Sequence, residues 1–315
     1  MTLEQSITED RQRRSRIVLP GTSEYKAAMK KAMQESKTEK RKPRPNNPAS
    51  NPTPRRVSTS NFDVDALVNN GRTFYDSTKE GVAIALEQTL NYAGSDGYVA
   101  TMPEFIAAKI KAPKTHDFWK NWYTVHTEEN IGIDREGIFV KRGEPVLVIV
   151  NGGGILTPDR IRQAYSEGLV GNSAKYTDKE FNDLLEGRLP DGSSIELHRL
   201  DDIKRGVPNL GHRFGVVMPY SLAQNTESGF YKEEAFVRND LAIARAGGPE
   251  NLLAYHKSAK DGDGDVGCYH PFNGRDTNVS QGRLLFLINY CYGLSGDSSL
   301  DNDGRFVGVG TGGAI

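Results

Sequence analysis

A chain of 315 residues, 37% of them hydrophobic, is long enough to bury a substantial core. No stretch approaches the ~20 uncharged apolar residues that a membrane span needs, and the first residues lack the apolar segment of a secretory signal. We therefore expect a soluble, cytoplasmic protein without membrane contacts.

The net charge of −1 conceals an uneven distribution along the chain. Residues 1–60 carry 14 Lys and Arg against 6 Asp and Glu, whereas residues 61–315 carry 26 and 35. A basic tail on an acidic body predicts weak, salt-sensitive contact with a polyanion, either nucleic acid or an acidic protein surface. A solvated tail without a partner has the same composition, so both interpretations stay open.

Residues 40–60 contain five prolines, no aromatic residue and one large aliphatic side chain, Val57. Such a segment buries too little apolar area to offset the entropy lost on ordering, which indicates an extended linker. Before it, an apolar stripe favours a short helix over residues 23–37. We expect a basic, largely disordered arm over residues 1–60 and one globular domain over residues 61–315.

The globular region opens with helices. Ser77 to Glu80 has the capping-box pattern and predicts a helix that ends at Gly94. Thr101 to Glu104 predicts the start of a second helix, which an aromatic cluster with both tryptophans follows.

A central strand is predicted over residues 145–150, a continuous apolar and mostly β-branched run. Such a run is typical of a strand with both faces covered. The segment 151–154, Asn-Gly-Gly-Gly, ends it. Thr157 and Pro158 then predict a helix start, with Thr as the cap and Pro in the first turn, and Gly168 predicts its end.

The remaining elements alternate irregularly. Thr177 to Glu180 is another capping box, and its helix should end at Gly187. Strands are expected at 214–218, 283–289 and 305–309, and a helix at 249–260. Because strands and helices are not regularly interleaved, the pattern favours an α+β fold with a mixed central sheet and surrounding helices.

The glycine turn is the first candidate site. A strand, a glycine run and a capped helix can present free backbone N–H groups to a phosphate or an oxyanion. The predicted ligand-binding residues are Asn151, Gly152, Gly153, Gly154, Arg160 and Arg162, with the arginines as partners of an anion. The turn lacks a Walker Lys-Ser/Thr pair, and the chain lacks a G-x-S-x-G elbow. Glycines also serve tight turns that bind nothing.

A candidate acid/base group lies upstream, where His126, Glu128 and Glu129 follow aromatic residues. An aromatic wall with His and Glu can form an acid/base pocket. The edge of a core followed by a solvated turn would have the same sequence, and that interpretation stays open.

Two acidic stretches raise the question of a metal. Asp261, Asp263 and Asp265 alternate with glycines, a spacing that can surround calcium with oxygen atoms. The Gly and Glu that complete an EF-hand loop are missing, which favours a polar surface loop. Asp301 and Asp303 belong to a second stretch, which would share a cation only if the loops meet in space.

Two functions follow from these features. The favoured one is an enzyme or small-ligand-binding domain that holds an anionic small molecule at the glycine turn. The alternative is a non-enzymatic interaction or structural protein whose basic arm binds a polyanion. The sequence indicates neither a cofactor nor a reaction.

Overall fold

The computed structural model describes residues 63–260, 265–269, 277–289, 292–296 and 299–310. The predicted arm over residues 1–60 and its helix at 23–37 lie outside this part of the chain. All described residues belong to a single compact unit. None of the helices in the described ranges is long and apolar enough to cross a membrane.

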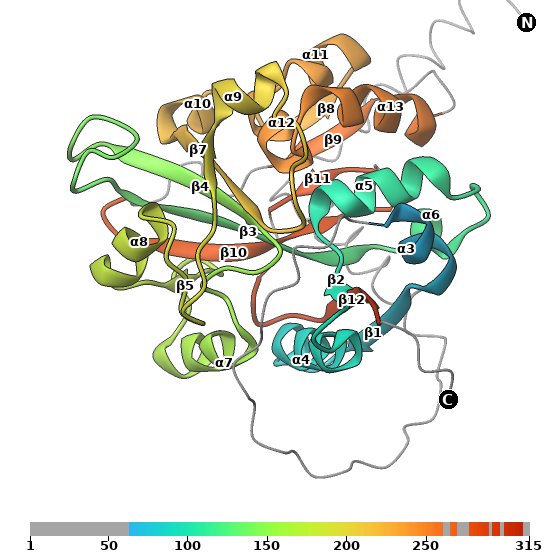
Figure 1. Cartoon of the computed structure of the whole chain (residues 1–315), viewed down its shortest axis with the longest axis horizontal. Coiled ribbons are helices and arrows are strands. Elements are labelled where there is room, and N and C mark those ends of the chain that lie inside the picture. The colour runs from blue at the N-terminus through green and yellow to red at the C-terminus, as the bar shows by residue number, and fades with distance from the viewer. Residues whose placement is uncertain (1–62, 261–264, 270–276, 290–291, 297–298, 311–315) are drawn as a thin grey trace, which may run out of the picture. The chain divides into compact units, whose positions relative to one another are not determined.

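Helices and strands follow one another irregularly along the chain, as Figure 1 shows. The helices are α3 (Val64–Asn70), α4 (Gly81–Ala93), α5 (Met102–Lys111), α6 (Asp117–Lys120), α7 (Pro158–Glu167), α8 (Asp178–Leu185), α9 (Leu200–Arg205), α10 (Tyr220–Gln224), α11 (Glu233–Val237), α12 (Asp240–Ala246) and α13 (Pro249–Lys260). The strands are β1 (Arg72–Asp76), β2 (Tyr98–Val99), β3 (Tyr123–Ile133), β4 (Pro145–Asn151), β5 (Ala174–Lys175), β6 (Leu197–Arg199), β7 (Phe214–Pro219), β8 (Gly229–Tyr231), β9 (Val266–Tyr269), β10 (Gln281–Leu287), β11 (Leu294–Ser295) and β12 (Gly304–Val309).

The strands form two sheets. The larger has the order β6-β7-β4-β3-β10-β11-β9-β8, and β5 pairs with β10 off this path. Its centre is antiparallel, while β6 with β7 and β11 with β9 are parallel pairs. The smaller sheet, β1-β12-β2, joins the first and last strands of the described chain in antiparallel register. The predicted α+β fold with a mixed sheet is therefore confirmed.

Strand β4 is the central strand that the sequence predicts, and it is buried on both faces. Val146, Val148 and Val150 pack into a core that includes residues of α4, α7 and α8. Leu147 and Ile149 belong to a second core, with residues of α5, α12 and α13. The two groups of helices cover opposite faces of the large sheet (Figure 1).

Most predicted helix starts are confirmed, and one is wrong. The Thr101 backbone N–H donates to the Glu104 side chain at 2.8 Å, and Thr157 and Thr177 cap α7 and α8. Helix α4, however, begins at Gly81 without a side-chain cap. The Thr78 hydroxyl and backbone N–H both bond to the Asp76 carboxylate, so this segment forms a local turn instead of the predicted capping box.

A buried ion pair crosses the second core. Arg245 of α12 contacts the Glu129 carboxylate of β3 through Nη2 at 2.6 Å and Nε at 2.8 Å, and the two side chains are 0% and 1% exposed. The Arg245 Nη1 group also donates to the main-chain carbonyls of Tyr269 and Leu294. One guanidinium therefore connects α12 to β3, β9 and β11.

Removing one partner of this pair should be costly, because it leaves the other group buried without a counter-charge. We expect Glu129→Gln to lower the free energy of unfolding by roughly 3–5 kcal/mol. The exposed pair between Glu234 and Arg238 is a matched control, since Glu234→Gln should cost less than ~1 kcal/mol. Chemical denaturation measures both values, and equal losses would contradict a structural role for the buried pair.

Candidate functional site

The glycine turn after β4 does hold an anion, and that anion is the Glu128 carboxylate. Gly154 N–H and Leu156 N–H donate to Glu128 Oε1 at 2.9 and 2.8 Å, and Ile155 N–H donates to Oε2 at 3.0 Å. An N–H cradle therefore forms at this turn, but Gly154 is the one predicted residue that donates to it, and Ile155 and Leu156 supply the other two N–H groups. Its donors are engaged by the chain itself, so an external anion would have to displace a buried carboxylate.

Each of the three glycines makes room for a different neighbour. A Cβ atom would lie 2.8 Å from the His212 carbonyl oxygen at Gly152, 2.7 Å from the His126 ring at Gly153 and 2.6 Å from Glu128 Oε2 at Gly154. Gly152 and Gly153 also have φ values of +78° and +92°, which side chains other than glycine rarely adopt. The glycine run is thus explained by packing around three polar side chains.

His126 is brought to this turn, but it is enclosed there. It is only 8% exposed, and its Nδ1 atom has no hydrogen-bond partner among the described residues. Burial lowers the pKa of His126 to about 3, with smaller contributions in the same direction from the neighbouring His212 and Arg213. The ring is therefore neutral at physiological pH. A second buried pair that the sequence does not reveal lies nearby, with His212 Nδ1 at 2.6 Å from Glu104 Oε1.

The adjacent acids Glu128 and Glu129 point to opposite faces of the sheet, because side chains alternate along a strand. Burial raises the pKa of Glu128 to about 7, although the three N–H donors favour the ionised form. Glu129 lies on the far face with Arg245. The structure therefore assembles His126 and Glu128 at the turn and separates Glu129 from them.

The two candidate arginines are paired with residues of other elements. Arg160 Nε donates to Glu180 of α8 at 2.8 Å, and Arg162 Nη2 donates to Glu87 of α4 at 2.6 Å. Asn151 is fully buried at the end of β4. These arginines thus fasten α7 to its neighbouring helices.

Of the three metal candidates, one lies in the part of the chain that the structure describes. Asp261 and Asp263 lie outside the described residues, and Asp265 is exposed. In the ranges that the structure covers, no group of three or more His, Cys, Asp or Glu is arranged to hold a metal ion.

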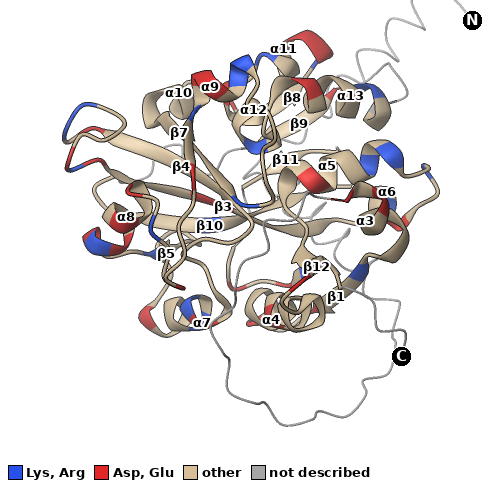
Figure 2. Cartoon of the chain, in the orientation of Figure 1, with Lys and Arg blue, Asp and Glu red and all other residues tan. Residues whose placement is uncertain are grey.

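A groove of about 680 Å³ lies beside the turn, between the start of α7, helix α8 and the segment 188–194. Its charged side chains are all engaged in ion pairs, although three cations face two acids. Arg160 pairs with Glu180, and both Lys179 and Arg188 pair with Asp183 at 2.6 Å. Figure 2 shows both signs of charge on α7 and α8. A ligand in this groove would have to compete with existing ion pairs.

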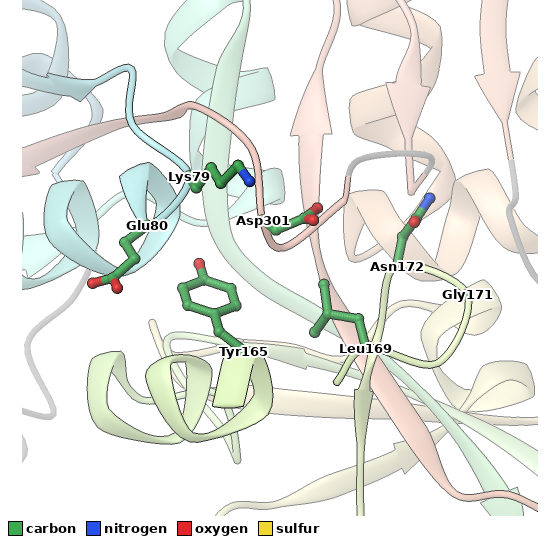
Figure 3. Close-up of a pocket in the computed structure, with 7 residues that line it drawn as sticks. All are labelled: Lys79, Glu80, Tyr165, Leu169, Gly171, Asn172 and Asp301. Atoms are coloured by element: carbon green, nitrogen blue, oxygen red, sulfur yellow. The ribbon is translucent and has the colours of Figure 1, made fainter. Parts of the chain in front are cut away.

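A cavity of about 510 Å³ has a different character (Figure 3). It lies between the start of α4, helix α7, the loop after α7 and the loop before β12. Its lining residues are Lys79, Glu80, Tyr165, Leu169, Gly171, Asn172 and Asp301. We call this space the α4–α7 cavity.

Main-chain groups hold the walls of the α4–α7 cavity together. Val82 N–H donates to the Asn302 carbonyl, and Leu300 N–H donates to the Asn172 carbonyl, each at 3.2 Å. The Tyr165 hydroxyl donates to the Leu300 carbonyl at 2.5 Å. The position of the loops therefore depends on backbone atoms and one tyrosine rather than on the charged side chains.

The charged side chains of the α4–α7 cavity remain available. Within the described ranges, Lys79, Glu80 and Asp301 take part in no ion pair. Sequence reasoning missed this site, because its residues come from three separate segments and no local pattern joins them. The one sequence signal for this cavity was the acidic stretch that contains Asp301.

Comparison with known proteins identifies a structural relative. No protein-family profile matches the chain, and no curated protein matches its sequence. A solved structure described as "Accommodation of massive sequence variation in Nanoarchaeota by the C-type lectin fold" aligns with a TM-score of 0.58 and 27% identity. The alignment covers 76% of this chain and 98% of that one. The fold described above is thus similar to the C-type lectin fold of that protein.

Gly153 and Gly168 offer a matched pair of substitutions to alanine. Both have positive φ, but a Cβ at Gly168 meets nothing within 4 Å, whereas one at Gly153 meets the His126 ring. We expect Gly168→Ala to cost about 1 kcal/mol of unfolding free energy from backbone strain. Gly153→Ala should cost roughly 1–3 kcal/mol more, the usual effect of overpacking. Thermal or chemical denaturation tests this, and a smaller loss at Gly153 would refute the contact.

The raised pKa of Glu128 predicts how stability depends on pH. A buried acid whose folded pKa exceeds its unfolded value stabilises the fold at low pH and loses that contribution as pH rises. The stability of the wild type relative to Glu128→Gln should thus fall by roughly 3 kcal/mol between pH ~4.5 and ~7. Urea denaturation of both proteins across this range isolates the effect. A relative stability that rises with pH would mean that the three N–H donors outweigh burial.

Proposed function

We propose that this chain is a ligand-recognition protein rather than an enzyme, and that its ligand enters the α4–α7 cavity. The observation that carries the proposal is a division between two sets of polar groups. His126 and Glu128, which resemble an acid/base pair in the sequence, are enclosed by the fold. The charges of Lys79, Glu80 and Asp301 line an open space and take part in no ion pair in the described chain, and of the three only Asp301 accepts a side-chain hydrogen bond there, from the Ser299 hydroxyl.

The size of the cavity supports this proposal. Small-molecule sites usually enclose ~300–1,000 Å³ and combine apolar walls with a few polar groups. The α4–α7 cavity has about 510 Å³, with Leu169 and the Tyr165 ring as its apolar part. The Lys79 and Asp301 side chains extend toward each other in this space, while the Glu80 carboxylate lies on the other side of Tyr165, as Figure 3 shows. Recognition by loop side chains on a rigid scaffold is a common arrangement for binding proteins.

The structural relative gives a second line of support. Its description states that a C-type lectin fold accommodates massive sequence variation. A scaffold accommodates variation where the variable side chains do not hold the backbone in place. The α4–α7 cavity meets this condition, because its walls are joined by main-chain hydrogen bonds. We infer that the side chains of this cavity determine which ligand binds and contribute little to stability.

A triple variant, Lys79→Ala, Glu80→Ala and Asn172→Gly, tests this separation. Glycine suits position 172, where φ is +71°. We expect its unfolding free energy to stay within about 1 kcal/mol of the wild type, as for surface substitutions. Ligands selected on the wild type from small-molecule and peptide libraries should lose binding to the folded variant, measured by calorimetry.

The control is the double variant Glu136→Ala and Lys141→Ala, whose residues are exposed in the loop between β3 and β4. It should bind every selected ligand like the wild type. If the selected ligands all bind the triple variant equally well, the cavity is not the recognition site. Ligands that bind the triple variant and fail to bind folded Gly153→Ala would instead favour the glycine turn.

A further inference from the structure

We infer that the group recognised in the α4–α7 cavity is an organic cation, such as a primary ammonium. This inference rests on the proposed function, because it names the ligand chemistry of the same cavity. The inference goes beyond the proposed function because it assigns a positive charge to the ligand. The argument depends on the balance of hydrogen-bond donors and acceptors that line the space.

Acceptors predominate in the cavity. Two carboxylates, those of Glu80 and Asp301, and one ammonium group, that of Lys79, line the space. The Tyr165 hydroxyl adds little donor capacity, since its proton is already donated to the Leu300 carbonyl. An anionic ligand would therefore meet two like charges and one opposite charge. An uncharged ligand would leave the lining with one negative charge in excess, because Lys79 offsets only one of the two carboxylates.

The carboxylates of Asp301 and Glu80 both influence the Tyr165 hydroxyl. Burial raises the pKa of the Tyr165 hydroxyl, and the negative charges of Asp301 and Glu80 also raise it, whereas a hydrogen bond from the Ala83 backbone and the charge of Arg162 lower it. The hydroxyl lies between the two acids in Figure 3. The negative potential is thus centred on the cavity, beside the aromatic ring of Tyr165. A cation placed there gains from both carboxylates and from the face of the ring.

Lys79 is the group that such a ligand would compete with. Its side chain extends toward Asp301 (Figure 3), yet the two form no ion pair in the described chain. A long, exposed lysine can move away at small cost, because it remains solvated when it does so. The groove beside α8 differs in this respect, since its cations are already paired with acids.

Titration of the full-length protein with n-butylammonium chloride tests the inference, followed by the amide signals of the described residues in NMR spectra. We expect shifts centred on Tyr165 and Asn172, and none from n-butanol or sodium butyrate at equal concentration. Asp301→Asn should weaken binding roughly fivefold, and Lys79→Gln should strengthen it roughly threefold, because a like charge is removed. Raising the ionic strength about tenfold should weaken binding.

Asp96→Asn is the matched control, since Asp96 is an exposed acid beyond the other end of α4 and should leave the affinity unchanged. Preferential binding of butyrate, or weaker ammonium binding in Lys79→Gln, would overturn the cation assignment. If n-butylammonium fails to bind while library ligands still depend on the residues of the triple variant, the assignment fails and the recognition function stands. If no ligand depends on those residues, the proposed function fails as well.

Discussion

The fold is organised around the need to stabilise two consecutive buried carboxylates on β3. Glu128 and Glu129 are both fully buried, and alternation along the strand sends them to opposite faces of the sheet. A buried charge is tolerated only when donors or a counter-charge surround it. On one face the backbone after β4 supplies three N–H donors, and on the other face Arg245 supplies its guanidinium. The glycine turn and helix α12 are thus the two partners that this strand requires.

This constraint explains why the chain resembles an enzyme in its sequence. A cradle of N–H groups, a histidine and a glutamate are the components of many catalytic sites, and here they are adjacent. In the fold the glutamate occupies the cradle, and the histidine fills the space above Gly153, where its Nδ1 atom has no hydrogen-bond partner among the described residues. The cradle is therefore filled by the chain itself. The charged side chains that form no ion pair in the described chain, Lys79, Glu80 and Asp301, belong to segments that share no common motif.

The elements of the fold could be predicted where the signal is local. The apolar run of β4 and the caps at Thr101, Thr157 and Thr177 need only a few neighbouring residues, and each was found. The start of α4 was misplaced because Asp76, one residue before the apparent capping box, binds Thr78 first. The occupant of the glycine cradle could not be predicted, since Glu128 lies 26 residues before Gly154 in the chain. A local pattern indicates what a turn can hold, and only the packing of strands decides what fills it.

The same distinction limits what the structural relative implies for this chain. Fold similarity transfers the scaffold, whereas ligand chemistry belongs to the side chains of the site. In the α4–α7 cavity those side chains are exposed and charged, and the backbone that carries them is fixed by main-chain hydrogen bonds. A change of charge at Lys79 or Asp301 therefore alters the potential of the cavity while the loops keep their positions. Specificity in such a site follows from the balance of two acids against one lysine, and that balance can change without a change of fold.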